Sequence, residues 1–269
     1  MLEQGSGTGS VFKLRLWHNI LVGYRPAWNE AVITDPHTFQ SGGDLSGQPA
    51  TDPSLDRPLA TAVAEVLPRH DFDAVRWSGD AVRSMLEAVG LSGILLKARD
   101  TASHTLAWAI WLLGEHSRWQ DPAALPRVVD EVLRLHPPLW LGTRVVSRDV
   151  ELAGVPVKRK AVVGYSPYLT HRDPALWDAP AEFRPERFDT RPPPWSYLPF
   201  GGGGDRIGLG EQLTRRLLMT ALVALCQRGL TVMRGDEARP RTNAGLRPAG
   251  PLWVIPGLRG NTLFRRSVG

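Results

Sequence analysis

The chain has 269 residues, of which 42% are hydrophobic and 22% are charged, and it carries a net charge of +5 with a pI near 9.8. This is the composition of a folded globular protein, long enough for one large domain or two small ones. The single cysteine, Cys226, excludes an internal disulfide and any site held by several cysteines. Basic residues are scattered among acids without a run of five or six like charges, which argues against nucleic-acid binding.

The longest apolar stretch, residues 106–113, is far too short to span a bilayer, and the N-terminal residues lack the apolar core of a signal peptide. With one cysteine, these features predict a cytoplasmic protein without a membrane span. The modest positive charge is compatible with docking of an acidic redox partner or carrier protein.

The first part of the chain is predicted to contain little regular structure. In chain order it comprises a Gly/Ser-rich disordered start (1–10), a strand, short helix and turn (17–40), a polar linker (42–53) and a helix (55–67). We therefore divide the chain into residues 1–53, a disordered start and short strand and helix segment with a linker, and residues 54–269, a larger core.

The core is predicted to be mainly helical. Its expected elements are a helical stretch (79–115), a second helix (120–135), short strands with a turn at Gly154 (142–163), an amphipathic helix (211–228) and a hairpin after residue 240. The apolar residues of the first stretch are too dense for a surface helix, so it should be enclosed. Pro137 and Pro138 stop the second helix. The predicted fold class is mainly α with small β-sheets, α+β.

A pair of opposite charges lies within the second helix. Glu131 and Arg134 are three residues apart, so their side chains share one helix face. Arg187, in the stretch PERF, would complete a triad in which the carboxylate accepts from two guanidinium groups. The alternative is an ordinary surface pair worth about a few tenths of a kcal/mol.

Residues 199–211, PFGGGGDRIGLGE, form a glycine-rich run in front of the last long helix. Backbone N–H groups and the helix dipole at such a place can bind phosphate. The run has neither the Gly-x-x-x-x-Gly-Lys-Ser/Thr nor the Gly-x-Gly-x-x-Gly spacing, which disfavours phosphate binding.

The frame Phe200, glycine-rich turn, Arg206-x-Gly208-x-Gly210 resembles the haem-binding loop of the cytochrome P450 family, Phe-x-x-Gly-x-Arg-x-Cys-x-Gly. Gly208 stands at the axial-ligand position, which is therefore vacant, and the alignment requires one additional glycine within residues 201–204. Four other segments resemble the family's motifs in the family's order: LKARDTAS (96–103), EVLRLHPP (131–138), RDPALWDAPAEFRPERF (172–188) and the lead-in to the loop (195–200).

The resemblance extends from about residue 85 to residue 255 and implies a cytochrome P450-like fold, truncated before the long central helix. It implies haem as the cofactor, held by a loop containing Phe200, Arg206, Gly208 and Gly210, and it places Arg144 as a partner of a haem propionate. In the core, residues 54–269, the family's elements would be the central helix, the Glu-x-x-Arg helix, the meander, the haem-type loop, the last helix and the hairpin.

The central helix would supply a proton-delivery pair. Asp100 and Thr101 occupy the acid and threonine positions of the family's oxygen-activating stretch, where they would relay protons to reduced dioxygen. The alternative is a pair of helix residues satisfied by local hydrogen bonds.

The axial ligand has no obvious replacement in the sequence. A thiolate favours O–O cleavage on haem iron, whereas glycine offers no ligand. Cys226 lies about sixteen residues into the next helix, which places it about 24 Å from Gly210 at about 1.5 Å per residue. The seven histidines show no metal-binding spacing, so we predict no metal ligands and expect each histidine to be a surface or packing residue.

Three functions follow. The first is a degenerate homologue of monooxygenase descent, impaired or inactive in haem-thiolate monooxygenation, which serves as an auxiliary or docking protein for a biosynthetic partner. The second is an active haem- and iron-dependent oxidoreductase that hydroxylates a small organic substrate with dioxygen. The third is a nonfunctional gene remnant.

Overall fold

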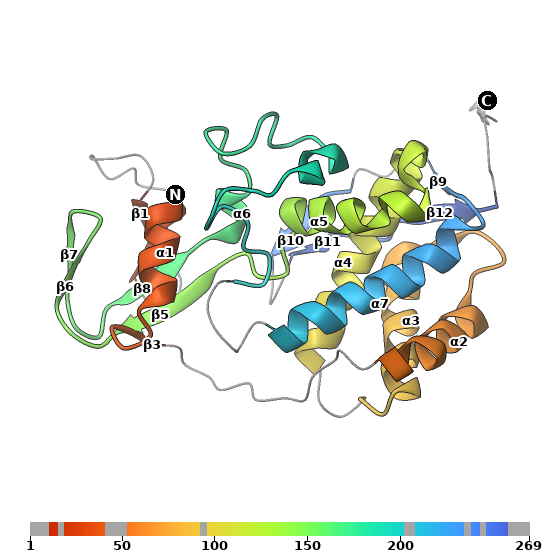
Figure 1. The fold of residues 1–269 in the computed structure, drawn as a ribbon, viewed down its shortest axis with the longest axis horizontal. Helices are drawn as coiled ribbons and strands as arrows, with labels where there is room; N and C mark the ends of the chain where they lie inside the picture. Colours follow the sequence, from red (N-terminus) through yellow and green to blue (C-terminus); the bar gives the residue numbers. More distant parts are fainter. Residues whose placement is uncertain are drawn as a thin grey trace. The chain divides into compact units, whose positions relative to one another are not determined.

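The computed structural model describes residues 11–15, 19–40, 53–91, 96–201, 208–233, 238–242 and 246–257. Helices and several small sheets alternate along this part of the chain, which confirms the predicted α+β class (Figure 1). Two compact units share the chain. Unit 1 holds Met1–Thr51 and Leu133–Leu213, and unit 2 holds Asp52–Val132 and Thr214–Gly269.

Unit 1 is built on a five-stranded sheet with the strand order β1-β2-β8-β5-β3. Strand β2 runs parallel to β8, with Val22 opposite Gly164, and the other neighbours are antiparallel. A separate hairpin, β6–β7, follows β5. The strands are β1 (Val11–Arg15), β2 (Asn19–Gly23), β3 (Phe39–Gln40), β5 (Gly142–Val146), β6 (Val150–Leu152), β7 (Val155–Val157) and β8 (Val162–Tyr165).

Helix α1 (Pro26–Thr34) packs against this sheet through one indole ring. Trp28 donates its Nε1–H to the carbonyl of Gly164 at 2.8 Å. The same ring leaves no room for a side chain at Gly23, where a Cβ would lie 2.3 Å from Trp28. Asp35 follows the helix and accepts from the Thr38 N–H at 2.9 Å, a local turn that leads the chain into β3.

Unit 2 combines helices with two small sheets. A three-stranded sheet has the order β4-β12-β9, and β10 pairs with β11 as the predicted C-terminal hairpin. The elements are α2 (Asp56–Val66), β4 (Phe72–Asp73), α3 (Ala74–Ala88), α4 (Leu96–Glu115), β9 (Leu230–Val232), β10 (Pro240–Thr242), β11 (Leu246–Pro248) and β12 (Trp253–Pro256). Helices α5 (Leu125–Leu135) and α7 (Gly208–Cys226) have residues in both units.

The central helix is enclosed as predicted. Leu106, Ile110 and Leu113 of α4 are completely buried, and the Trp108 indole N–H donates to the carbonyl of Leu246 in β11 at 3.2 Å. Among the described residues, no helix is long and apolar enough to cross a membrane.

The prediction of one helical stretch over residues 79–115 is wrong, because two helices, α3 and α4, occupy this interval. The first ends at Ala88, and Gly90 just beyond it adopts a positive φ of 71° that side-chain-bearing residues rarely adopt. The N–H groups of Gly90 and Leu91 donate back to the carbonyls of Glu87 and Leu86, closing the last turn of α3.

Other predicted boundaries also shift. Helix α5 begins at Leu125 rather than at residue 120, since residues 117–119 and 122–124 form short 3-10 turns. Helix α7 begins at Gly208, three residues before the predicted start. The predicted disordered start at residues 1–10 and most of the predicted linker at 42–53 lie outside the described residues.

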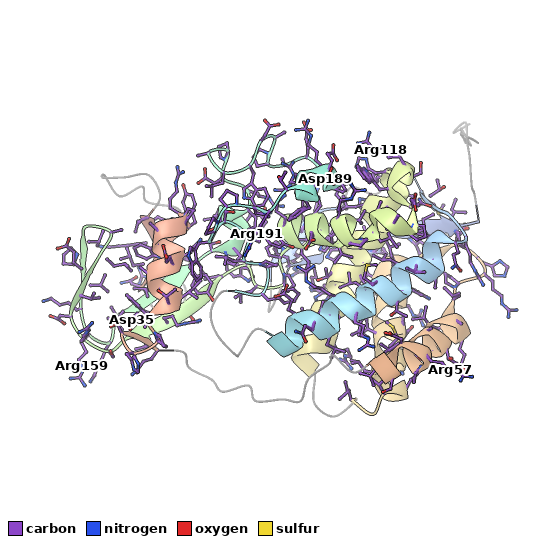
Figure 2. All side chains as sticks on the ribbon, in the orientation of Figure 1. Asp35, Arg57, Arg118, Arg159, Asp189 and Arg191 are labelled. Carbon is purple, nitrogen blue, oxygen red and sulfur yellow. The ribbon has the colours of Figure 1, made fainter. Side chains whose placement is uncertain are left out.

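Exposed charges of both signs occur in both units. Figure 2 labels several of them, which lie on different elements: Arg57 on α2, Arg118 after α4, Arg159 after the β6–β7 hairpin, and Asp189 and Arg191 in and after the 3-10 turn Pro185–Asp189. This mixture agrees with the scattered charges of the sequence.

Candidate functional site: the entrance to the glycine-rich loop

The structure describes the backbone that leads into the glycine-rich run as far as Gly201. The carbonyl of Pro199 accepts from the Leu139 N–H at 3.2 Å, and the Gly201 N–H donates to the carbonyl of Leu198 at 3.0 Å. Phe200 lies half-buried in the turn between them. We call residues 198–201 the loop entrance.

Gly201 is required at this place for two reasons. Its φ is +84°, in the left-handed region, and a Cβ would lie 2.7 Å from the hydroxyl oxygen of Tyr165 and 3.0 Å from a methyl carbon of Leu139. A larger residue would therefore strain the backbone and displace Tyr165.

His171 joins the loop entrance to helix α5. The residue follows the short helix α6 (Pro167–Thr170), and its side chain is completely buried. Its Nε2 accepts from the Leu198 N–H at 2.7 Å, while its Nδ1 lies 3.0 Å from the carbonyl of Arg134. A carbonyl can only accept, so Nδ1 carries the proton and the ring is the neutral Nδ1–H tautomer.

The surroundings of His171 favour this neutral form. The pKa of His171 is lowered to about 3, chiefly by burial. The hydrogen bond to the Arg134 carbonyl opposes this shift, and the positive charges of Arg134 and Arg172 act in the same direction as burial. His136, just beyond α5, is half-buried, and desolvation followed by the charges of Arg172 and Arg134 holds its pKa well below the usual value.

Arg134 organises the segment that precedes the loop entrance. Its guanidinium donates to the carbonyls of His171 at 2.7 Å, Pro180 at 2.8 Å and Glu182 at 3.1 Å. The group also lies 5.2 Å from the ring centre of Trp177. Three backbone segments thus converge on one buried cation, and the planar guanidinium suits such fixed, divergent acceptors.

Arg187 acts on the same segment. It donates from Nη1 to the carbonyl of Asp178 at 2.9 Å and from Nη2 to that of Ala179 at 3.4 Å. Glu131 and Arg134 are both completely buried on α5, which contradicts the alternative of an ordinary surface pair. The predicted triad of Glu131, Arg134 and Arg187 stays a prediction.

The predicted cofactor-loop residues are described in part. Gly208 is the first residue of α7 and Gly210 lies in its first turn, whereas Arg206 lies outside the described residues. Arg144, on β5, is half-buried, with its guanidinium 5.4 Å from the ring centre of Tyr165 and Nη1 donating to the carbonyl of Thr143 at 2.9 Å. Tyr165 therefore contacts Arg144 and also borders the loop entrance.

Cys226 lies at the opposite end of α7 from Gly208. It is the last residue of the helix and is 1% exposed. Eighteen residues at about 1.5 Å each place it about 27 Å from Gly208 along the axis. Within the part of the chain that the structure describes, no group of three or more His, Cys, Asp or Glu residues could hold a metal ion.

The predicted proton-delivery residues occupy the first turns of α4. The Asp100 side chain is 59% exposed and pairs with Arg99 at 3.4 Å. Thr101 is half-buried, and its carbonyl accepts from the Thr105 hydroxyl at 2.9 Å. One turn further, His104 is half-buried, and desolvation lowers its pKa, helped by the charge of Arg247 and opposed by that of Asp100. Proton delivery by Asp100 and Thr101 stays a prediction.

Sequence comparisons relate this chain to a known protein family. Residues 123–248 match the family model described as Cytochrome P450. Cyclooctatin synthase of Streptomyces melanosporofaciens is 35% identical over 193 residues, which cover 61% of this chain and 41% of the relative. Cytochrome P450 3A13 of Mus musculus is 34% identical over 172 residues, covering 54% of this chain and 34% of the relative. The chain thus spans well under half the length of these curated relatives.

Solved structures share the fold at low sequence identity. The retinoic-acid-bound cyanobacterial CYP120A1 superposes with a TM-score of 0.75 and 21% identity, over 92% of this chain and 91% of that one. A 6-coordinated cytochrome P450 from Thermus thermophilus gives a TM-score of 0.71 and 18% identity, over 92% and 94%.

The described structure has the fold of these solved cytochromes P450. The sequence matches and the fold together support a member of the cytochrome P450 family. Family membership implies haem, with oxidoreductase and monooxygenase activity as the chemistry of the family.

Little in the sequence indicated the role of His171. We expected each histidine to be a surface or packing residue, and the polar neighbours in THRDP resemble those of an exposed turn. What distinguishes His171 is that both ring nitrogens bind backbone groups far away in the chain, at Arg134 and Leu198. No pattern in the residues next to His171 indicates hydrogen-bond partners so far away along the chain.

Proposed function

We propose that this chain is a degenerate member of its family, which keeps the scaffold but is impaired or inactive in haem-thiolate monooxygenation and serves as an auxiliary or docking protein. The observation that carries the proposal is Gly208, which aligns with the axial cysteine of the family's haem-binding loop and begins α7. Glycine has no side chain that could donate electrons to iron.

The loss of this ligand removes a specific chemical contribution. In the family the axial thiolate pushes electron density toward iron and favours cleavage of the O–O bond. Cys226 does not supply a substitute, since it is buried about 27 Å along the helix axis from Gly208. The residues present therefore do not fit a thiolate-held haem, and we derive no reaction step through that group.

The scaffold around the vacant position is nevertheless intact in the described residues. Arg134, Arg187 and His171 hold the segment before the loop through hydrogen bonds to backbone groups, and none of these bonds involves a cofactor. A buried, satisfied polar network of this kind specifies one arrangement of the chain. This supports a folded protein with a binding role over a nonfunctional remnant.

The partner in this proposal is a protein, either a redox partner or a biosynthetic enzyme. Exposed arginines such as Arg57, Arg118 and Arg159 can take part in steering an acidic surface (Figure 2). We place the protein in the cytoplasm, because a chain with one cysteine does not need an oxidising compartment to form disulfides.

The decisive experiment is a spectrum of the purified full chain, expressed with an ample haem supply, reduced and exposed to carbon monoxide. We expect no thiolate-type Soret band and iron far below one atom per chain. A thiolate-type band would overturn the proposal. Stoichiometric haem with a histidine-type spectrum would favour the alternative of an active haem- and iron-dependent oxidoreductase.

Restoring the ligand tests the cause. In the variant Gly208→Cys with Gly203 deleted, both departures from the family loop are repaired. The matched control is Gly79→Cys on α3, where a Cβ meets nothing within 4 Å and the thiol is remote in sequence from the loop. A thiolate-type band in the repaired loop but not in the control shows that Gly208 is the cause. Absence of cooperative unfolding in the unmodified chain would instead support the gene remnant.

A further inference from the structure

The loop entrance is held by His171 in a way that does not depend on a cofactor. Leu198 donates its N–H to Nε2 at 2.7 Å, a short bond in a completely buried place, and Nδ1–H donates to the Arg134 carbonyl. One rigid ring thus bridges the end of α5 and the loop entrance.

We propose that His171 is the positioning residue of the loop entrance: its neutral Nδ1–H ring fixes the Leu198 amide, so that residues 198–201 keep their backbone conformation without a bound haem. This inference rests on the proposed function, in which the scaffold persists with a vacant ligand position.

The ring is itself fixed on several sides. Tyr197 stacks on it with ring centres 5.4 Å apart, and Trp177 lies edge-on at 6.3 Å. The carbonyl of His171 accepts from Arg134, so backbone and side chain of the histidine are both tied to one residue of α5. A ring held in this way cannot rotate to exchange its two nitrogens without breaking buried hydrogen bonds.

The neighbouring charges favour the neutral ring that the loop entrance requires. The groups with charge or a titratable proton that face His171 are Arg134 from α5, Arg172 from the next position in the chain and Tyr197 from the segment before the entrance. The two arginines disfavour a positive ring. A protonated ring would also lose the lone pair that accepts from Leu198, so the neutral form and the loop entrance are coupled.

Amide hydrogen exchange in the haem-free full chain tests the proposal directly. We expect the Leu198 amide to be protected, and in His171→Ala its exchange should be at least about tenfold faster, as expected for loss of a buried hydrogen bond of about 1.4 kcal/mol. In His171→Gln the side-chain Oε1 can accept from Leu198, so much of the protection should return. The matched control is His104→Gln in unit 2, which should leave Leu198 unchanged.

A second measurement remains informative where His171→Ala fails to fold. Nitrogen NMR of the unmodified chain, with labelled histidine, should show a His171 ring with an unprotonated Nε2 from pH 7 down to pH 5. An Nε2–H tautomer would overturn the proposal. So would a Leu198 amide that exchanges freely in the haem-free chain, or one equally protected in the unmodified chain and in His171→Ala.

Failure of this inference is distinguishable from failure of the proposed function. Haem and iron content decide whether the ligand position is functional, and they are measured on the same preparation. Both proposals would be contradicted if the chain binds haem and the Leu198 amide is protected from exchange only when haem is bound. An exposed Leu198 in a haem-free chain would contradict the positioning role alone.

Discussion

Arg134 and His171 exchange hydrogen bonds in both directions. The guanidinium of Arg134 donates to the His171 carbonyl at 2.7 Å, and the ring of His171 donates to the Arg134 carbonyl at 3.0 Å. Both residues are completely buried, so neither bond competes with water. The pair joins the end of α5 to the chain after α6 and extends through Nε2 to Leu198.

The stability of the protein should fall as the pH decreases below about 6.5. The pKa of His171 is lowered from 6.5 to about 3 in the folded state, so over this window the unfolded chain binds a proton that the folded chain does not. The stabilisation that the neutral His171 ring contributes is therefore complete above pH 6.5. It is lost as the pH falls toward 3, by up to about 1.4 kcal/mol per pH unit. His136 contributes in the same direction.

Urea unfolding at pH 7, 6 and 5 checks this dependence. Over that range most carboxylates are already ionised in both states, so histidines dominate the slope. The slope of the unfolding free energy against pH reports how many protons the chain takes up on unfolding. In His171→Gln this number should be smaller by about one than in the unmodified chain. Parallel stability curves for the two proteins would show that His171 does not titrate on unfolding.

Replacement of Arg134 by lysine should be strongly destabilising although the positive charge is retained. A single ammonium group cannot reach the carbonyls of His171, Pro180 and Glu182 together, and it leaves buried acceptors unsatisfied. We expect a loss of roughly 3 kcal/mol in the free energy of unfolding. Arg187→Lys, at a half-buried position, is the matched control and should cost less than about 1 kcal/mol. Equal losses would contradict a special role for Arg134.

Alanine at Gly201 should destabilise the loop entrance. The substitution combines a φ of +84° with a Cβ 2.7 Å from the Tyr165 hydroxyl, and we expect a cost of about 1–3 kcal/mol. Gly79→Ala, in the open middle of α3, should instead stabilise the protein by about 0.5–1 kcal/mol, because alanine favours the helix. Thermal and urea unfolding measure the stability of the two variants. If Gly201→Ala unfolds with the same free energy as the unmodified chain, the turn does not require glycine.

Cys226 should behave as a buried packing residue. Its thiol is 1% exposed, so a thiol reagent should fail to modify the native chain and should react fully after unfolding in urea. Cys226→Ala should cost about 1 kcal/mol and leave the haem and iron content unchanged. A change in either content would mean that this cysteine takes part in ligand binding.

Much of the helical core was accessible from local patterns. The dense leucines of residues 106–113 predicted an enclosed helix, and the structure buries them in α4. The division between α3 and α4 was missed because apolar residues continue through it, and Gly90 ends the helix through its backbone conformation. Strand β4 was also missed, since Phe72–Asp73 is short and gains order only by pairing with β12.

The sequence by itself indicated the family and predicted the vacancy at Gly208, because both inferences depend on the identity and spacing of residues. It also placed Glu131 and Arg134 on one face of a helix. Only the tertiary structure showed that these two charges are buried, that Arg134 binds three distant carbonyls, and that His171 connects it to Leu198. The physical reason is that a buried polar group must find its partners through space, and those partners lie up to 48 residues away along the chain.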